Sequence, residues 1–385
     1  MKHKIIRIVL VFLITVSSCY TQQEAYHWYF GNYAGISFDT PDGKPIAMKD
    51  GQIHFDPSLN LIEGCSAFSG KNGKLQLYTD GVYVYNRDHE VMYSGLKGHA
   101  SSMQSSIVVP DPGDINKYYI FTVDEAGYVD LPNKGMNYST VDISYSDGLG
   151  RIYMFNRPIF DKTSEQLTAV EHKNGKDYWV ITHKLNGNDF LAFLVTEEGI
   201  EDTVVSSVGP EYYYDPLKSE WVGGSIKLSP DGRFLIANYF IRNIDKNETS
   251  SILYRFNNES GKITQPLTLL KNDEIFSNHG EFSHDATKLY LEVSNEDNTS
   301  VNIFQYDLEA PTKQDIKESR KSIVQHQGFK RDLGCMQMAP DGKIYVAMDS
   351  SRYLHKIDFP NKKGVSCDFV SYYLDLKDRI SGKEL

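Results

Sequence analysis

Short stretches of alternating apolar and polar residues follow one another along most of the chain, and turns built on Asp and Gly separate them. The clearest copy is LSPDGRFLIAN at Leu228–Asn238, and related stretches return at Phe282–Ser294 and Met338–Asp349. Asp-Gly supplies the positive-φ positions of a tight hairpin, and the alternation predicts a strand with one buried face. Because one such unit is too small to bury its own apolar face, we expect the copies to stack against each other.

The same plan extends through the N-terminal half of the chain. Turns lie about 42 to 60 residues apart, near residues 72, 114, 174, 231, 285 and 341, which is close to the repeat period of propeller blades. The aromatic stretch His27–Phe38 predicts one further pair of strands, which either completes the last blade or begins a seventh. A helical period is missing except at Asp315–Ser322, where we expect a short helix.

These features predict an all-β protein, a β-propeller with six or seven blades, each a four-stranded antiparallel sheet set around a central channel. Residues 28–385 would form this single domain. A β-sandwich and a two-domain β protein are the alternatives, and the repeat period favours them less. Asp231, Asp285 and Asp341 occupy equivalent turns, so we expect them to shape the blades rather than to carry chemistry.

The N-terminus has the features of an export signal. Positive residues precede the apolar run Ile8–Val16, which is too short to span a bilayer. Residues 1–19 therefore read as a signal peptide, followed by a polar leader at 20–27. Val16-Ser17-Ser18-Cys19 resembles a lipobox, which makes Cys19 the candidate site of lipid attachment. Ordinary cleavage near Thr21 or Gln22 is the other interpretation, and it would discard Cys19. No later segment has the length and apolar character of a transmembrane helix.

Charge and cysteine content narrow the range of partners. The 385-residue chain carries a net charge of −11, which argues against nucleic acid, because a phosphate backbone needs a basic surface. Cys65, Cys335 and Cys367 follow the signal region and allow one disulfide at most, with the pairing left open. No C-x-x-C pair is present, so the sequence indicates neither a zinc clip nor a thioredoxin-type site.

One stretch gathers candidate metal ligands. On a strand, His279 and Glu281 share a face, and His284 follows in the next turn. Metal-dependent hydrolysis would need three such ligands that converge on one ion with a position left open. Because the entries of the other blades carry similar small and polar residues, we expect this stretch to pack a loop. We predict no metal and no cofactor.

Two further stretches are candidates for function. His99 lies in the Ser-rich segment Gly98–Ser106, but the chain has no G-x-S-x-G elbow, and we predict no catalytic residue. Tyr212, Tyr213 and Tyr214 lie in Gly209–Glu220, which reads as a loop before a blade entry. Exposed loop aromatics are plausible binding residues. We therefore expect ligand contacts from these tyrosines, with His99, His279 and Glu281 as weaker candidates.

Several longer stretches resemble one family. They are WYFGNYAGISF, EGCSAFSGKNGKLQLYTDGVYVYNRDHEVM, GHASSMQSSIVVPDPGDINKYYIFTVD and LTAVEHKNGKDYWVITHKLNGNDFLAFLV. They look like the N-terminal WD40-like propeller region of Bacteroidetes cell-surface proteins associated with type IX secretion and gliding motility. The resemblance covers about Tyr26 to Tyr373 and implies an exported, non-enzymatic binding or scaffold module. This chain departs from the family because no sorting domain follows the propeller and the chain stops at SGKEL. That puts type IX export in doubt and leaves open whether the last blade is complete.

The sequence therefore predicts an exported, non-enzymatic propeller of the bacterial cell envelope, at the outer membrane, in the periplasm or on the cell surface. It would bind a protein or glycan partner through one loop face, and would contact the membrane only through a lipid on Cys19. The alternative is a metal-dependent, lactonase-like hydrolase that uses the central channel, and a third reading is a purely structural envelope component. Fold alone does not separate these functions.

Overall fold

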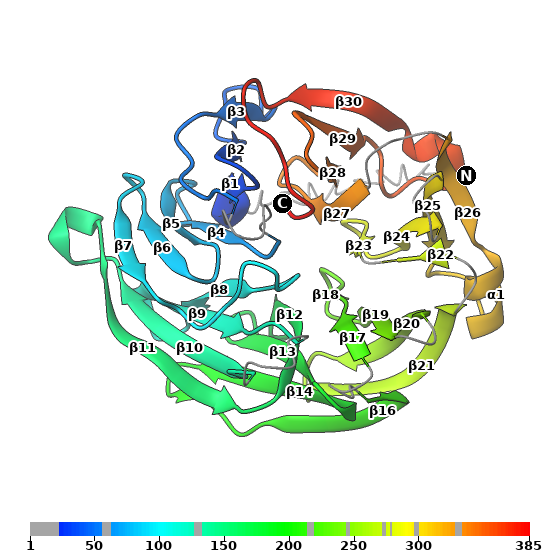
Figure 1. Ribbon diagram of the computed structural model, residues 1–385, viewed down its shortest axis with the longest axis horizontal. Helices are drawn as coiled ribbons and strands as arrows, with labels where there is room; N and C mark the ends of the chain where they lie inside the picture. Colours follow the sequence, from blue (N-terminus) through cyan, green and yellow to red (C-terminus); the bar gives the residue numbers. More distant parts are fainter. Residues whose placement is uncertain are drawn as a thin grey trace, which may run out of the picture.

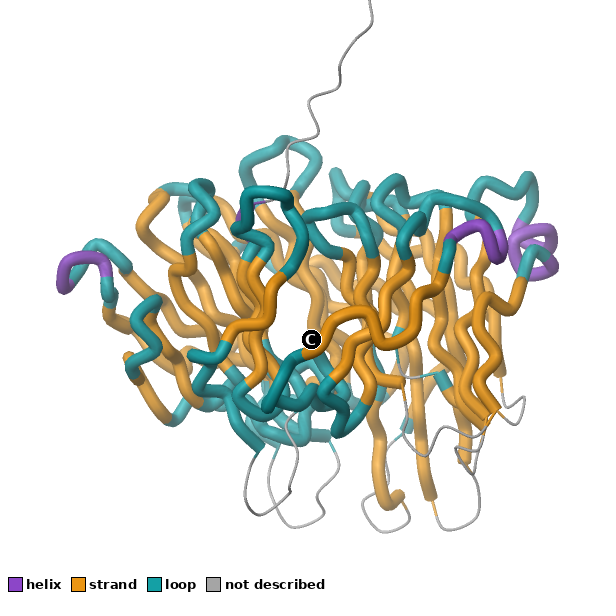
Figure 2. The backbone as a smooth tube through the Cα atoms, turned by 90° about the horizontal axis from the view of Figure 1, so that it is seen from above, coloured by secondary structure: helices purple, strands orange, loops and turns teal. Residues whose placement is uncertain are grey.

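Seven antiparallel sheets stand like blades around a central channel in the computed structural model (Figure 1). The structure describes residues 23–55, 63–126, 133–213, 219–243, 247–271, 275–277, 279–295, 300–327 and 333–385. The prediction of a β-propeller is confirmed, with seven blades. Strands run between two loop-bearing faces of the ring (Figure 2).

The blades follow one another in chain order. Blades 1 to 3 contain β1 (His27–Phe30), β2 (Ala34–Ser37) and β3 (Ile46–Met48); β4 (Ser66–Ser69), β5 (Leu75–Thr79), β6 (Tyr83–Asn86) and β7 (Val91–Ser94); and β8 (Ser106–Asp111), β9 (Asp114–Val123), β10 (Met136–Asp142) and β11 (Arg151–Phe160). Blade 4 contains β12 (Thr163–Glu171), β13 (Tyr178–Lys184), β14 (Gly187–Thr196), β15 (Gly199–Ile200) and β16 (Val204–Tyr212).

The last three blades complete the ring. They contain β17 (Ser219–Gly223), β18 (Ile226–Leu228), β19 (Phe234–Asn243), β20 (Asn247–Asn257) and β21 (Lys262–Lys271); β22 (Ile275–Phe276), β23 (Gly280–Phe282), β24 (Lys288–Asn295), β25 (Ser300–Asp307) and β26 (Lys321–Gln327); and β27 (Leu333–Met338), β28 (Ile344–Met348), β29 (Tyr353–Ile357) and β30 (Phe369–Asp375). In blades 5 and 6 the inner strand is in two pieces, because β17 and β18 both pair with β19, and β22 and β23 both pair with β24.

Helices are short. They are η1 (Gln23–Ala25), η2 (Ser146–Gly148), α1 (Lys313–Glu318) and η3 (Gly364–Cys367). The expected helix at Asp315–Ser322 exists but begins earlier, because Thr312 and Asp315 form a capping box at its N-terminus. None of the helices within the described ranges has the length and apolar character needed to cross a membrane.

The recurring Asp residues hold the turns. Asp231 accepts a hydrogen bond from the Arg233 backbone N–H at 3.1 Å, and Asp341 accepts one from the backbone N–H two residues further on at 3.1 Å. Gly232 and Gly342 supply the positive φ of these turns, and Ala286 takes the same conformation beside Asp285. The carboxylates thus organise the turn backbone, as their recurrence predicted.

The core lies between neighbouring blades rather than inside any one of them. Each apolar cluster combines residues of two adjacent sheets, as where Phe190 of blade 4 meets Ile226 and Tyr254 of blade 5. The cluster between blade 7 and blade 1 contains Trp28 and Tyr345, whose rings meet edge to face with their centroids 6.0 Å apart. A blade therefore becomes stable only when both of its faces are covered, which explains why the alternating pattern recurs without a break.

The ring closes through the segment Leu376–Leu385, which we call the tail. The tail leaves β30, passes the β1–β2 turn, where Ile380 bridges Asn32, and then turns into the channel (Figure 1). There it lies against β27, where the Lys383 carbonyl accepts a hydrogen bond from the Cys335 backbone N–H at 2.5 Å, while blade 1 has β1 as its own inner strand. The aromatic stretch at the N-terminus therefore begins a seventh blade, while blade 7 has four strands of its own.

Candidate functional site

The channel holds a cavity of about 750 Å³. The inner strands β1, β4, β8, β12, β18, β23 and β27 line it together with the tail. The cavity reaches the turns that follow these strands, among them those at Pro110, Lys173 and Asp231, and we call this end the mouth. A cavity of this size lies in the range of natural ligand sites, so the channel is the candidate functional site.

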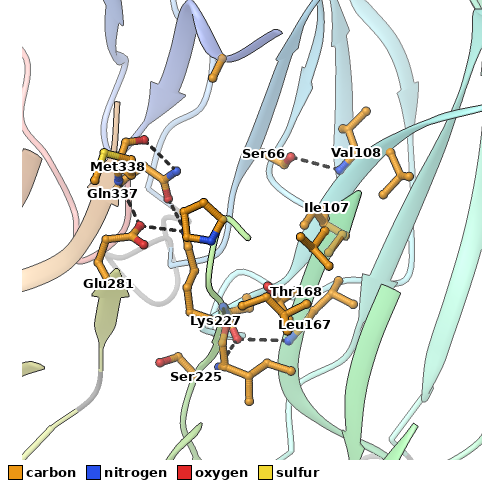
Figure 3. Close-up of a pocket in the computed structure, with 18 of the residues that line it drawn as sticks. Ser66, Ile107, Val108, Leu167, Thr168, Ser225, Lys227, Glu281, Gln337 and Met338 are labelled. Atoms are coloured by element: carbon orange, nitrogen blue, oxygen red, sulfur yellow. Dashed lines mark hydrogen bonds and ion pairs between the residues drawn. The ribbon is translucent and has the colours of Figure 1, made fainter. Parts of the chain in front are cut away.

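Lys227 on β18 crosses the channel to two other blades. Its Nζ lies 3.1 Å from Glu281 Oε2 on β23 and donates to Gln337 Oε1 on β27 at 2.8 Å (Figure 3). Three blades are thus tied together by one side chain. Because the ammonium group already faces a carboxylate, this lysine contributes little uncompensated positive charge to the cavity.

Glu281 is a tie between blades. Its side chain is 1% exposed, and its carboxylate accepts hydrogen bonds from the backbone N–H groups of Phe282 at 2.7 Å and Met338 at 3.0 Å. Together with the ion pair to Lys227, these contacts use the carboxylate oxygens. The sequence analysis expected the stretch around Glu281 to pack a loop; in the structure Glu281 lines the channel, and its contacts are with the protein itself.

His279 contacts the tail. Its Nε2 lies 3.3 Å from Glu384 Oε1, and both side chains are buried. Burial lowers the pKa of His279 to about 3, and burial raises the pKa of Glu384 well above its ordinary value. Burial thus favours the uncharged form of both groups in this pair. His279 and Glu281 both reach the channel, but no group of three His, Cys, Asp or Glu within the described ranges could hold a metal ion.

Gln104 is a channel residue that the sequence reasoning missed. Its Oε1 accepts hydrogen bonds from the backbone N–H of Leu167 at 3.1 Å and of Ile226 at 2.8 Å, and its Nε2 donates to the Ile226 carbonyl at 2.9 Å. The side chain therefore connects blade 3 to blades 4 and 5. The available signal was a long polar side chain at the entry of an apolar strand.

A group of acidic residues lies where the inner strands begin, at the end of the channel opposite the mouth. Glu165 accepts hydrogen bonds from the backbone N–H of Met103 at 3.1 Å and of Ala126 at 3.2 Å. Burial raises the pKa of Glu165 well above its ordinary value, and burial raises the pKa of Glu63 to about 7. Burial therefore favours the protonated form of both carboxyls, and the charge of Glu63 raises the pKa of Glu165 further.

His99 belongs to this acidic group. Its Nδ1 lies 2.8 Å from Glu125 Oε2, and the hydrogen bond to this carboxylate raises the pKa of His99. The Ser105 hydroxyl accepts the His99 backbone N–H at 3.1 Å, so it serves the segment's own backbone. His99 thus lies at the opposite end of the channel from the mouth.

The tyrosine segment differs from its expected form. Tyr212 lies in strand β16 rather than in a loop, stacks on Tyr239 with ring centroids 4.2 Å apart, and shares a 2.7 Å hydrogen bond with Ser250. Strand pairing with β14 and this stacking hold it against the sheet. Tyr213 is 64% exposed, and its hydroxyl donates to Glu211 at 2.8 Å. Tyr214 lies outside the described residues.

The cysteines form no disulfide within the described part of the chain. Cys65, Cys335 and Cys367 are free thiols. Burial raises the pKa of all three, in the case of Cys367 to about 11. They are therefore protonated and poorly reactive at neutral pH. Cys19 and the rest of the predicted signal region lie outside the described residues.

Comparison with known proteins finds solved structures that resemble this chain at low sequence identity. No protein-family model matches the sequence, and no curated protein does. Among solved structures, a polysaccharide lyase family 25 ulvan lyase matches with a TM-score of 0.46 at 8% identity, over 79% of this chain and 78% of the lyase. An oligogalacturonate lyase from Vibrio parahaemolyticus matches with a TM-score of 0.40 at 12% identity, over 87% and 83% of the chains. Regucalcin from Agrobacterium tumefaciens, described as a calcium-binding protein, matches with a TM-score of 0.36 at 13% identity, over 66% and 71%.

These comparisons correct one expectation. The resemblance to surface propellers implies a non-enzymatic binding or scaffold module. That interpretation is wrong, because the propellers that match this chain include lyases as well as a binding protein. At these identities the likeness concerns the fold alone and transfers no substrate to this chain.

Proposed function

We propose that the chain is an exported β-propeller of the bacterial cell envelope that binds a protein or glycan partner in its central channel. The observation that carries the proposal is the cavity of about 750 Å³ at the point where all seven blades meet. Export and an envelope location rest on the predicted signal region, residues 1–19, and on the resemblance to Bacteroidetes surface propellers.

The composition of the cavity wall favours ligand binding there. Apolar side chains such as Ile107 and Leu167 alternate with the hydroxyl groups of Ser66 and Thr168 around the cavity (Figure 3). Ligand sites commonly combine an apolar wall with a few fixed polar groups. The ties made by Lys227 and its partners hold the wall in one geometry, which lowers the entropy cost of binding.

The test is a substitution that fills the cavity. Gln337→Trp places a bulky ring beside Lys227, whereas Gln314→Trp on α1 adds the same ring to an exposed helix as a matched control. Capture of partners from envelope extract and binding to a glycan array should fall with Gln337→Trp and persist with the control. Equal binding by both variants, with both folded by circular dichroism, would refute a channel site.

Membrane anchoring has a separate test. If Cys19 carries a lipid, Cys19→Ala should move the protein from the membrane fraction to the soluble fraction of cells. An unchanged membrane fraction would show that the lipid anchor is absent or unnecessary. Binding in the channel does not depend on this result.

Hydrolysis in the same channel is the second candidate. The observation that favours it is the buried carboxyl of Glu384 beside His279: burial raises the pKa of this carboxyl, and a carboxyl with a raised pKa can act as a general acid. Turnover of a panel of lactones, aryl esters and aryl glycosides by the full chain, lost in Glu384→Gln, would support it. Absence of turnover across the panel would count against it.

A further inference from the structure

A buried serine opens one inner strand at the end of the channel opposite the mouth, which we call the floor. Ser106 begins β8, lines the cavity and is 6% exposed, and its hydroxyl has no hydrogen-bond partner among the described residues. Because β8 has six residues, about 17 Å of strand separates Ser106 from the mouth. A buried hydroxyl without a partner costs free energy unless a ligand or water satisfies it.

The polar side chains beside Ser106 already serve the protein itself. Ser66 lines the same wall, and its hydroxyl accepts the Val108 backbone N–H at 3.2 Å. The amide of Gln104 forms the three hydrogen bonds to blades 4 and 5 described above. Among these three residues of the floor, Ser106 is therefore the one whose polar group is left for a ligand.

The charges at the floor are balanced. Lys227 Nζ lies 3.1 Å from Glu281 Oε2. In the pair of His279 and Glu384, burial favours the uncharged form of both groups. The acidic group around Glu165 is not among the described residues that line the cavity. A charged ligand group would lose its hydration at the floor without gaining a counterion, so the floor favours an uncharged group.

Three methionines line the cavity from different sides. Met103 precedes blade 3, whereas Met336 and Met338 belong to β27 of blade 7. Blades 1 and 2 separate these positions on one side of the ring, and blades 4 to 6 on the other. Thioether sulfurs make favourable contacts with aromatic rings, and the flexible methionine side chain adapts to their shape. An aromatic ring therefore suits this part of the wall.

We propose that the floor of the channel binds a phenol group, with its ring between Met103 and Met336 and its hydroxyl on Ser106 Oγ. The inference rests on the proposed function, because it takes the channel as the binding site. The same chemistry is available from a free phenol and from a tyrosine side chain of a partner protein, and the experiment separates these two sources.

The experiment compares small probes that differ in one group. Binding of p-cresol, toluene, benzylamine and benzoate to the full chain is measured by NMR titration at pH 7. p-Cresol should bind about fivefold more tightly than toluene, since that is the net value of one hydrogen bond. Benzylamine and benzoate should bind at least about tenfold more weakly than p-cresol, because the floor offers no free counterion to a buried charge.

Two serine variants locate the site. Ser106→Ala should lower the affinity for p-cresol to that for toluene and leave toluene binding unchanged. Ser66→Ala removes a hydroxyl of the same wall that the Val108 N–H already occupies, so the preference for p-cresol should persist. Because the Ser106 hydroxyl has no partner within the described ranges, its removal should not lower the urea midpoint, which separates a lost ligand contact from a lost fold.

The blocked peptide Ac-Ala-Tyr-Ala-amide distinguishes the sources. Tighter binding of the peptide than of p-cresol indicates the side chain of a partner protein, and the reverse order indicates a free phenol. Equal affinities for p-cresol and toluene, an equal loss of the preference in both serine variants, or binding of methyl glucoside in place of the aromatic probes would overturn the proposal. If no probe binds while Gln337→Trp still abolishes capture of a partner, the proposed function stands and only the phenol site is refuted.

Discussion

Glu63 provides a quantitative test of the acidic group at the channel end opposite the mouth. Burial is the main reason that its pKa is raised from 4.5 to about 7, and nearby Glu125 and Asp349 raise it further while Lys383 lowers it. The side chain is almost fully buried, and its Oε2 has no hydrogen-bond partner among the described residues. Replacement by glutamine keeps the shape of the side chain and removes the ionisable group.

The sign of the pH effect follows from the direction of the shift. Because the pKa of Glu63 is raised in the folded chain, Glu63 binds its proton more tightly when the chain is folded. Its contribution to the free energy of unfolding is therefore fully present below pH 4.5 and is lost as the pH rises to 7. The full loss is about 3 kcal/mol, at 1.36 kcal/mol for each pH unit. About 2.5 kcal/mol of this loss of stability falls between pH 5 and pH 8, according to the linkage relation.

Urea unfolding of the natural chain and of Glu63→Gln, at pH 5 and at pH 8, measures this pH-dependent contribution of Glu63 to stability. The variant should gain about 2.5 kcal/mol relative to the natural chain between the two pH values. Glu309→Gln, at an exposed position, is the control and should show no such gain. A difference between the variant and the natural chain that stays constant from pH 5 to pH 8 would refute the reasoning.

Three further predictions concern the ring and its cysteines. A Cβ on Gly334 would overlap the tail backbone, so Gly334→Ala should lower the free energy of unfolding in urea by about 2 kcal/mol. An unchanged urea midpoint would contradict the contact between the tail and blade 7. Glu281→Ala leaves Lys227 without its carboxylate and should cost about 3 kcal/mol, whereas adding Lys227→Met should recover part of that loss, as a double-mutant cycle can show. Cys335 and Cys367 should react with a thiol reagent only after unfolding, because both are buried and protonated, and fast labelling of the folded chain would argue otherwise.

Part of the candidate site could be predicted from the sequence. His279 and Glu281 stood out as potential ligands, and the structure brings both to the channel. Gln104 did not stand out, because the residues that it joins are far away in sequence, Ile226 being 122 positions further on. Its role depends on which strand ends meet across the channel, and local pattern carries no information about that.

The sequence by itself determined the blades. Alternation and Asp-Gly turns act through backbone hydrogen bonds and side-chain facing within about 20 residues, so strands, turns and their period can be read directly. Only the tertiary structure decided how the ring closes and what fills its centre. Closure depends on the contacts of the tail with Asn32 and Gly334. Asn32 lies hundreds of positions before the tail in the sequence, and Gly334 belongs to blade 7. The buried pairs of the channel arise where those distant segments meet, and burial at that point, rather than residue type, sets the charge states of Glu63, His279 and Glu384.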